Sequence, residues 1–155
     1  MIGHEMIKLS KLLLPLIMAF AIVGCTSLSN KPIYNDQGYA VTGYDVVAYF
    51  TENKAVKGST DFQAEYQGSQ WLFASKEHLA QFKQSPERYA PQYGGYCAYA
   101  MSSGFVVSSD PQAFTVYQDK LYLNYSLSVR ENWLENKAQF IQEADGYWQQ
   151  KVTKN

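Results

Sequence analysis

The chain has few cysteines, no cluster of charge and no repeated segment. The first two of these features each exclude a class of protein. Two cysteines among 155 residues are too few for a scaffold held by disulfides. Lysine and arginine, 13 together, nearly balance the 14 acidic residues and form no basic patch, so we expect no nucleic-acid partner. Tyrosine, by contrast, is abundant, with 13 residues. Tyrosine at this density is typical of a small core that is filled by tyrosine rings, with the hydroxyl groups of those tyrosines reaching water.

The first 24 residues have the pattern of an export signal. Lys8 and Lys11 precede an apolar run at 12–23 that is too short to span a bilayer. The run ends in "IVGC" at 22–25, which resembles the bacterial lipobox, whose cysteine is lipidated and becomes the first residue of the mature protein. We therefore expect a lipoprotein signal peptide and a lipid anchor on Cys25, with acyl chains such as palmitate. An ordinary signal peptide with an incidental cysteine is the alternative.

The residue after the predicted anchor bears on location. It is Thr26, whereas an aspartate there would favour retention in the inner membrane. We expect attachment to the outer membrane, facing the periplasm. Without the signal's two lysines and one glutamate, 11 basic and 13 acidic residues remain, so attachment must come from the lipid rather than from charge. The expected organisation is a signal peptide at 1–24, a lipidated N-terminus and tether at 25–38, and a single domain at 39–150.

Two β-hairpins are predicted. Segments 61–74 and 113–125 each contain two aromatic-rich runs on either side of a polar turn, near Gly68 in the first and near Asp119 in the second. The segment before them, 39–50, has the composition of an extended chain broken at a glycine.

Two helices are predicted to accompany the hairpins. Segment 75–85 should form a short helix capped by Ser75. Ser128 and Glu131 form a capping box that opens a second helix. Its apolar residues recur at helical spacing: Val129, Trp133, Ala138, Ile141 and Ala144. The pattern predicts an α+β fold, in which a small antiparallel sheet of hairpins packs with short helices in a single domain.

The second cysteine follows a Gly-Gly step. Residues 96–103 could form two helical turns after Gly94 and Gly95, with Cys97 in the first turn, where backbone N–H groups are free. A thiol-based redox protein using Cys97 is therefore an alternative function. Thiol catalysis usually needs a resolving thiol or a nearby base, and His78 is the only candidate imidazole of the mature chain. We expect a binding protein rather than an enzyme.

Four stretches together resemble a known family. They are "GYDVVAYF", "YQGSQWLFAS", "FKQSPERYAPQYGGYCAYA" and "KLYLNY", the last followed by a helix that contains tryptophan. The chain resembles the YHS-domain family from about Tyr39 to Trp148, and more narrowly its exported, lipoprotein-like branch. Members of this family occur with copper-transporting ATPases and in multicomponent oxygenases, where short cysteine motifs handle metal. The resemblance thus implies a small hairpin-and-helix fold with an association with metals.

The metal ligands of that family are largely replaced in this chain. The metal-type pattern begins Asp-Pro-Val-Cys. The corresponding residues here, 45–48, read Asp-Val-Val-Ala, so Ala48 stands at the cysteine position. A second pattern, Phe-Cys-Ser-x-x-Cys, has Ala74 at its first cysteine and His78 at its second. The scaffold residues fit the family, whereas the thiolates do not.

A rebuilt metal site is one hypothesis. The soft donors left in the mature chain, apart from the lipidated cysteine, are Cys97, Met101 and His78. Cys97 and Met101 are four residues apart and would share a helix face. A thiolate, a thioether and an imidazole together suit Cu(I), so copper is the possible cofactor. The alternative is that Cys97 and Met101 are core residues.

An aromatic pocket is the leading hypothesis for a functional site. Tyrosines cluster around two glycines that would let a ligand approach the backbone closely. The expected ligand-binding residues are Tyr89, Tyr93, Gly94, Gly95, Tyr96, Cys97 and Tyr99. The sequence therefore predicts a periplasm-facing lipoprotein that binds a small ligand or a soft metal ion. A structural or interaction protein of the cell envelope is a further alternative, and the sequence identifies no protein partner.

Overall fold

The structure is a computed structural model that describes residues 31–153. The expected signal peptide and the lipidation site Cys25 lie outside the described residues. Within residues 31–153, no helix is long and apolar enough to cross a membrane.

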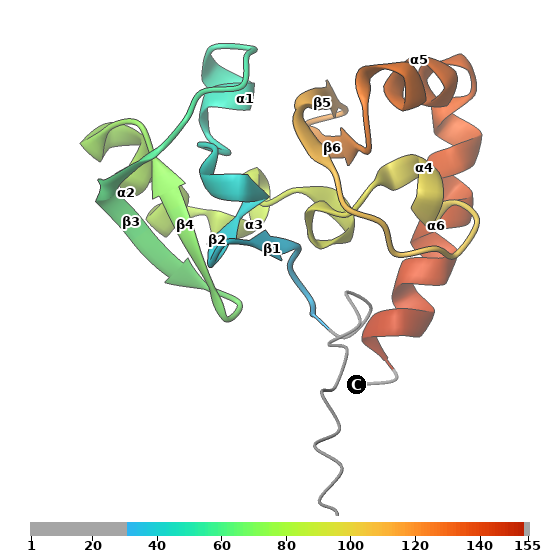
Figure 1. The fold of residues 1–155 in the computed structure, drawn as a ribbon, viewed down its shortest axis with the longest axis horizontal. Helices are drawn as coiled ribbons and strands as arrows, with labels where there is room; N and C mark the ends of the chain where they lie inside the picture. Colours follow the sequence, from blue (N-terminus) through green and yellow to red (C-terminus); the bar gives the residue numbers. More distant parts are fainter. Residues whose placement is uncertain (1–30, 154–155) are drawn as a thin grey trace, which may run out of the picture.

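The chain folds into two lobes that lie side by side (Figure 1). The first lobe contains β1 (Asn35–Asp36), β2 (Tyr39–Ala40), η2 (Val41–Gly43), α1 (Ala48–Thr51), β3 (Ser59–Tyr66), β4 (Ser69–Phe73), α2 (Lys76–Gln84) and α3 (Pro86–Tyr89). The second lobe contains η3 (Gln92–Gly95), α4 (Ala98–Met101), β5 (Asp110–Tyr117), β6 (Lys120–Asn124), α5 (Leu127–Glu135) and α6 (Lys137–Val152). Helices and small sheets combine in one domain, so the predicted α+β class is confirmed.

Each lobe is built on one of the two predicted hairpins. In the first lobe the strand order is β1-β2-β4-β3, with β3 and β4 antiparallel and one parallel pair between Tyr39 and Gln70. In the second lobe β5 and β6 form an antiparallel sheet of their own. Both turns contain residues with positive φ, at 67–68 and 118–119, as two-residue loops of twisted hairpins require. The hairpins therefore lie in two sheets rather than in one.

The predicted cap of the first helix is confirmed. Ser75 precedes α2, and its Oγ accepts a hydrogen bond from the backbone N–H of His78 at 3.1 Å. This bond satisfies one of the N–H groups that a helix start leaves free. Phe82, one turn further along, is buried in the core.

The segment 39–50 is not extended as a whole, which corrects the prediction. Only Tyr39–Ala40 is a strand, and α1 begins at Ala48. The cause is Asp45, whose Oδ1 accepts the backbone N–H groups of Val47 at 2.9 Å and of Ala48 at 3.3 Å. Because the carboxylate satisfies two N–H groups at the start of a helical turn, the chain bends there instead of continuing as a strand.

The second predicted helix begins earlier and is divided, which is a further correction. Ser126 rather than Ser128 caps α5, since the Oγ of Ser126 accepts the backbone N–H of Val129 at 3.3 Å. At Asn136 the backbone leaves the helical region (φ −137°, ψ 38°), and α6 follows. Asparagine is suited to such a break because its side chain competes for nearby backbone groups.

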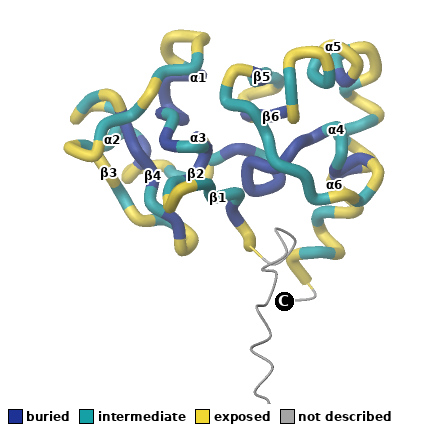
Figure 2. The backbone as a smooth tube through the Cα atoms, viewed as in Figure 1, coloured by how far each residue is buried: buried dark blue, intermediate teal, exposed yellow. Residues whose placement is uncertain are grey.

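Two groups of buried side chains form the interior. The core of the first lobe contains Trp71 and Phe82, and it also includes Leu121 and Leu123 of β6. The core of the second lobe lies under α5 and α6 and contains Trp133, Tyr122 and Met101. The segment 93–98 is buried throughout and runs between the lobes (Figure 2). This segment and β6 therefore join the two lobes.

Candidate functional site

A cleft of about 640 Å³ lies where both lobes meet the first described residues of the chain. Its walls come from the β3–β4 turn, the α3–η3 segment, the β5–β6 turn and the last turns of α6. Aromatic side chains line it from three elements: Tyr66, Tyr93 and Trp148. Charged side chains of both signs lie among them: Glu87, Lys120 and Asp145. Three glutamines add amide groups: Gln67, Gln92 and Gln149.

Tyr93 is fixed in the wall of the cleft. Its hydroxyl donates a hydrogen bond to Oδ1 of Asp145 at 2.9 Å, and the carbonyl oxygen of Ile141 lies at 3.3 Å as a longer acceptor. Burial raises the pKa of Tyr93 well above its ordinary value, and the bond to Asp145 adds to this effect. Tyr93 therefore remains a neutral donor that ties η3 to α6.

The Gly-Gly step serves contacts within the chain. A Cβ on Gly94 would lie 2.0 Å from the carbonyl oxygen of Pro32, and the carbonyl of Gly94 accepts the N–H of Tyr34 at 2.8 Å. A Cβ on Gly95 would lie 3.2 Å from the ring of Pro91. The backbone that approaches Gly94 is thus the chain's own N-terminal segment, whereas Gly95 faces side chains. Of the two glycines, Gly94 alone lines the cleft.

Part of the segment expected as a tether at 25–38 contacts the folded chain. Ile33 is buried in the core of the first lobe, and β1 begins at Asn35. Pro32, Gln37 and Gly38 are exposed.

The other tyrosines of the predicted pocket pack elsewhere. Tyr89 is buried and packs edge-to-face against Phe50, with the ring planes at 84° and the centroids 5.5 Å apart. Tyr99 makes a similar contact with Phe140 at 5.0 Å. The hydroxyl of Tyr96 donates to the carbonyl oxygen of Lys31 at 3.1 Å. Of the seven predicted ligand residues, only Tyr93 and Gly94 line the cleft.

Cys97 caps a helix and does not line the cleft. Its sulfur is buried and accepts the N–H groups of Ala100 at 3.5 Å and Tyr125 at 3.3 Å. The S–H group lies 3.7 Å from Oδ1 of Asn124, which also accepts the N–H of Tyr99. The thiol therefore occupies the N-cap of α4 and links that helix to the end of β6. Cys97 thus lies at a helix start, but α4 is one turn at Ala98–Met101 rather than the two turns predicted over 96–103.

A second polar cluster centres on Asp45, which is fully buried. Its Oδ1 accepts the two N–H groups described above, and its Oδ2 accepts the N–H of Ala74 at 2.8 Å and faces Nδ1 of His78 at 2.6 Å. Four partners use the four acceptor positions of a carboxylate. Because this carboxylate accepts only, Nδ1 of His78 must carry the proton. No local pattern links Asp45 to His78, because they are 33 positions apart in the sequence.

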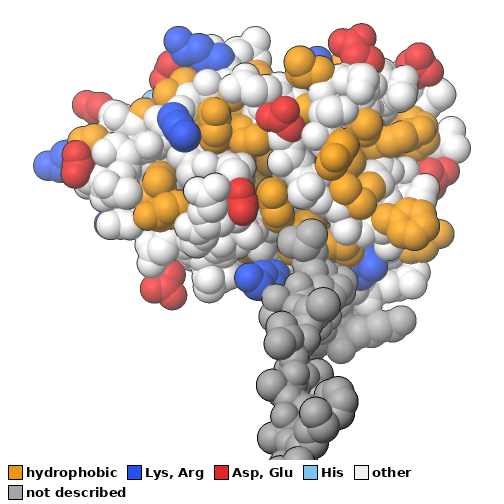
Figure 3. All heavy atoms as spheres, viewed as in Figure 1, with side chains coloured by type: hydrophobic (Ala, Val, Ile, Leu, Met, Phe, Trp, Pro, Cys, Tyr) orange, Lys and Arg blue, Asp and Glu red, His pale blue; other side chains and the backbone are white. Residues whose placement is uncertain are grey.

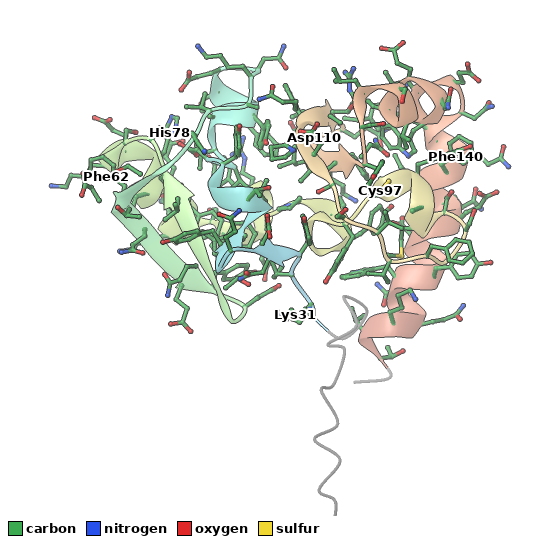
Figure 4. All side chains as sticks on the ribbon, in the orientation of Figure 1. Lys31, Phe62, His78, Cys97, Asp110 and Phe140 are labelled. Atoms are coloured by element: carbon green, nitrogen blue, oxygen red, sulfur yellow. The ribbon has the colours of Figure 1, made fainter. Side chains whose placement is uncertain are left out.

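The other nitrogen of His78 faces the surface. Nε2 lies 3.4 Å from Oγ1 of Thr51, and the His78 side chain is 14% exposed. Figure 4 shows His78 in the first lobe and Cys97 in the second, well apart in the plane of the view. The structure therefore does not bring His78 to Cys97 and Met101, and the three-donor copper site is not formed.

The positions at which the family resemblance expects cysteines do converge. Ala48 and Ala74 donate their N–H groups to Asp45, and His78 contacts the same carboxylate. The residues present do not fit a metal, however, because the two alanines offer no ligand atom and the acceptor positions of Asp45 are filled. Within residues 31–153, no group of three or more His, Cys, Asp or Glu side chains could hold a metal ion. His78 Nε2 is the one ligand atom that remains in this cluster.

Comparison with known families identifies part of the chain. Residues 47–93 match the family model of the YHS domain. The match runs from the start of α1 through the rest of the first lobe and ends at Tyr93 in η3. It includes Ala48, Ala74 and His78, the three positions that contact Asp45. Searches of curated proteins and of solved structures gave no significant match. The resemblance to the YHS family is therefore confirmed for this segment, whereas the exported, lipoprotein-like branch stays a prediction.

Proposed function

We propose that this protein is a lipid-anchored protein of the cell envelope, attached at Cys25, whose cleft binds a small organic ligand. The cleft carries the proposal, because its walls combine aromatic rings with amides and charges of both signs. Concave sites that mix apolar walls with a few placed polar groups are typical of small-molecule binding. The outer membrane, with the domain in the periplasm, is the location we propose.

An organic ligand is favoured over a metal ion. The YHS match on its own is compatible with metal binding, since that is what the family resemblance implies. Against this, Ala48 and Ala74 carry no ligand atoms, and Met101 is buried in the second lobe, away from His78. The cleft, in contrast, offers hydrogen-bond donors, acceptors and rings at one place.

Two measurements on the native protein test the proposal. Native mass spectrometry of the protein purified from membranes should show a bound small molecule, and elemental analysis should show no stoichiometric copper. Gln149→Trp should fill the cleft and remove the bound mass. Gln142→Trp adds the same side chain to an exposed position of α6 outside the cleft and should retain it. Stoichiometric copper without a bound molecule would contradict the proposal and favour the metal hypothesis.

The anchor has its own test. Cys25→Ser should abolish incorporation of radiolabelled palmitate, since only the thiol can take the lipid. Palmitate in the Cys25→Ser variant, or none in the natural protein, would contradict the lipoprotein assignment.

A further inference from the structure

The end of α6 carries exposed apolar side chains that no described part of the chain covers. Phe105, Tyr147 and Val152 are 66%, 42% and 43% exposed. The ring of Tyr147 lies against Gly104, where a Cβ would be 3.0 Å from it, so the loop that carries Phe105 packs beside Tyr147. Trp148 and Lys151 complete this surface, which we name the C-terminal rim: Phe105, Tyr147, Trp148, Lys151 and Val152.

The rim lies beside the entry point of the chain. Trp148 and Val152 line the same cleft as Pro32, and Figure 1 shows the end of α6 on the same side of the molecule as the first described residues. Pro32 is seven residues after Cys25, and such a segment spans at most about 25 Å. From Tyr147 to Val152 the helix rises only about 7.5 Å. A bilayer that holds the lipid of Cys25 is therefore within reach of the rim residues of α6, and the loop that carries Phe105 packs beside Tyr147 of that helix.

The chemistry of the rim matches a membrane interface. Aromatic side chains and lysine are the residues that settle at the level of lipid headgroups, because each has an apolar body and a polar tip. Figure 3 shows Lys or Arg side chains on both sides of the entry point, and Lys31 is labelled there in Figure 4. Exposed apolar surface beside basic groups is what an interfacial contact needs.

We propose that the C-terminal rim contacts the headgroup layer of the membrane and so fixes the orientation of the anchored domain. The inference rests on the lipid anchor of the proposed function and adds a second point of attachment. Two-point attachment holds the cleft at the membrane surface, because the cleft lies between the rim and the tether.

Trp148 provides a reporter for this contact. Trp71 and Trp133 are buried in the two cores, whereas Trp148 is only partly buried. Lipids that carry a spin label near the headgroup quench tryptophan over short distances. The test measures quenching of the protein anchored in vesicles that contain such lipids, and Trp148→Phe should remove most of it.

Paired variants distinguish the rim from apolar surface in general. The double variant Phe105→Ser/Tyr147→Ser should lose about half or more of the quenching, since buried apolar area sets the strength of interfacial binding. Tyr125→Ser/Leu127→Ser removes two side chains that are each 56% exposed, but they lie just before and at the start of α5, away from the entry point. This control pair should leave the quenching unchanged.

Three results would overturn the proposal. They are the absence of quenching in the anchored protein, equal losses in both double variants, and a stable dimer or protein complex that depends on Phe105 and shields Trp148 from the lipid. A second preparation tests the rim without relying on lipidation in cells. The chain beginning at Cys25 is coupled through the Cys25 thiol to a maleimide lipid. Cys97 does not compete for the reagent, because it is buried. Quenching in this preparation supports the rim even if palmitate labelling fails in cells.

Discussion

Nδ1 of His78 lies 2.6 Å from Oδ2 of Asp45, and this contact joins α2 to the turn that begins α1. The carboxylate also holds three backbone N–H groups, so it organises the segment where the YHS match begins. A buried charge with this many partners is strongly coupled to the fold.

Asp45→Ala should therefore destabilise the protein by about 3–5 kcal/mol, because it leaves several buried donors without acceptors. Asp110→Ala is the matched control, since its carboxylate accepts a single N–H, from Gln112, in a solvent-exposed hydrogen bond at the start of β5. The control should cost only about 0.5–1.5 kcal/mol. Urea unfolding measures both values. Equal costs would mean that the Asp45 cluster does not organise the first lobe.

Gly94→Ala tests the close approach of the N-terminal segment. The new Cβ would meet the carbonyl oxygen of Pro32 at 2.0 Å, at a backbone φ of +62°. Gly68→Ala has a similar φ of +71° with no atom within 4 Å, so it reports the backbone strain alone. We expect about 1–2 kcal/mol for Gly68→Ala and clearly more for Gly94→Ala, measured by thermal unfolding. If both variants lose the same stability, the Pro32 contact is not tight in solution.

Cys97→Ser should keep most of the stability that Cys97→Ala loses. A serine hydroxyl can accept the same N–H groups and is a good N-cap, whereas alanine leaves them without a partner. We expect a loss of about 1–2 kcal/mol for the alanine variant relative to the serine variant. Thiol labelling of the native protein should be slow, because the sulfur is buried. Fast labelling under native conditions would instead support the thiol-redox alternative.

Buried tyrosines should make the protein sensitive to alkali. Burial raises the pKa of Tyr96 and of Tyr122 to about 12, from an ordinary 10.0. The folded protein thus keeps these protons to higher pH than the unfolded chain, so their contribution is complete below pH 10 and is lost as the pH rises toward 12. The urea midpoint should fall across this range, and the fall should be smaller in Tyr122→Phe. A midpoint that stays constant from pH 10 to 12 would contradict this reading.

Local chemistry explains which parts of the fold were predictable. Both hairpins and the Ser75 cap follow from residues that are neighbours in the sequence, so their patterns were sufficient. Ser126 and Ser128 both have the chemistry of a cap, and only the path of the chain after β6 selects Ser126. The role of Asp45 could not be predicted, because its partners Ala74 and His78 are remote in the sequence.

The candidate site depended more strongly on tertiary structure. The cleft combines Pro32, Tyr66, Tyr93 and Trp148, and no local pattern links these positions. Two residues of the tyrosine cluster around the glycines, Tyr93 and Gly94, line the cleft. The other tyrosines of the cluster pack away from it, because a dense aromatic sequence fills a core as readily as it forms a pocket.

The sharing of β6 between the lobes determines how the protein unfolds. Leu121 and Leu123 belong to the core of the first lobe although they lie well beyond residue 93, where the YHS match ends. A fragment cut at that boundary would expose the side of the core that these leucines cover. We therefore expect the two lobes to lose structure in one cooperative transition, and a fragment that ends at residue 93 should not fold on its own.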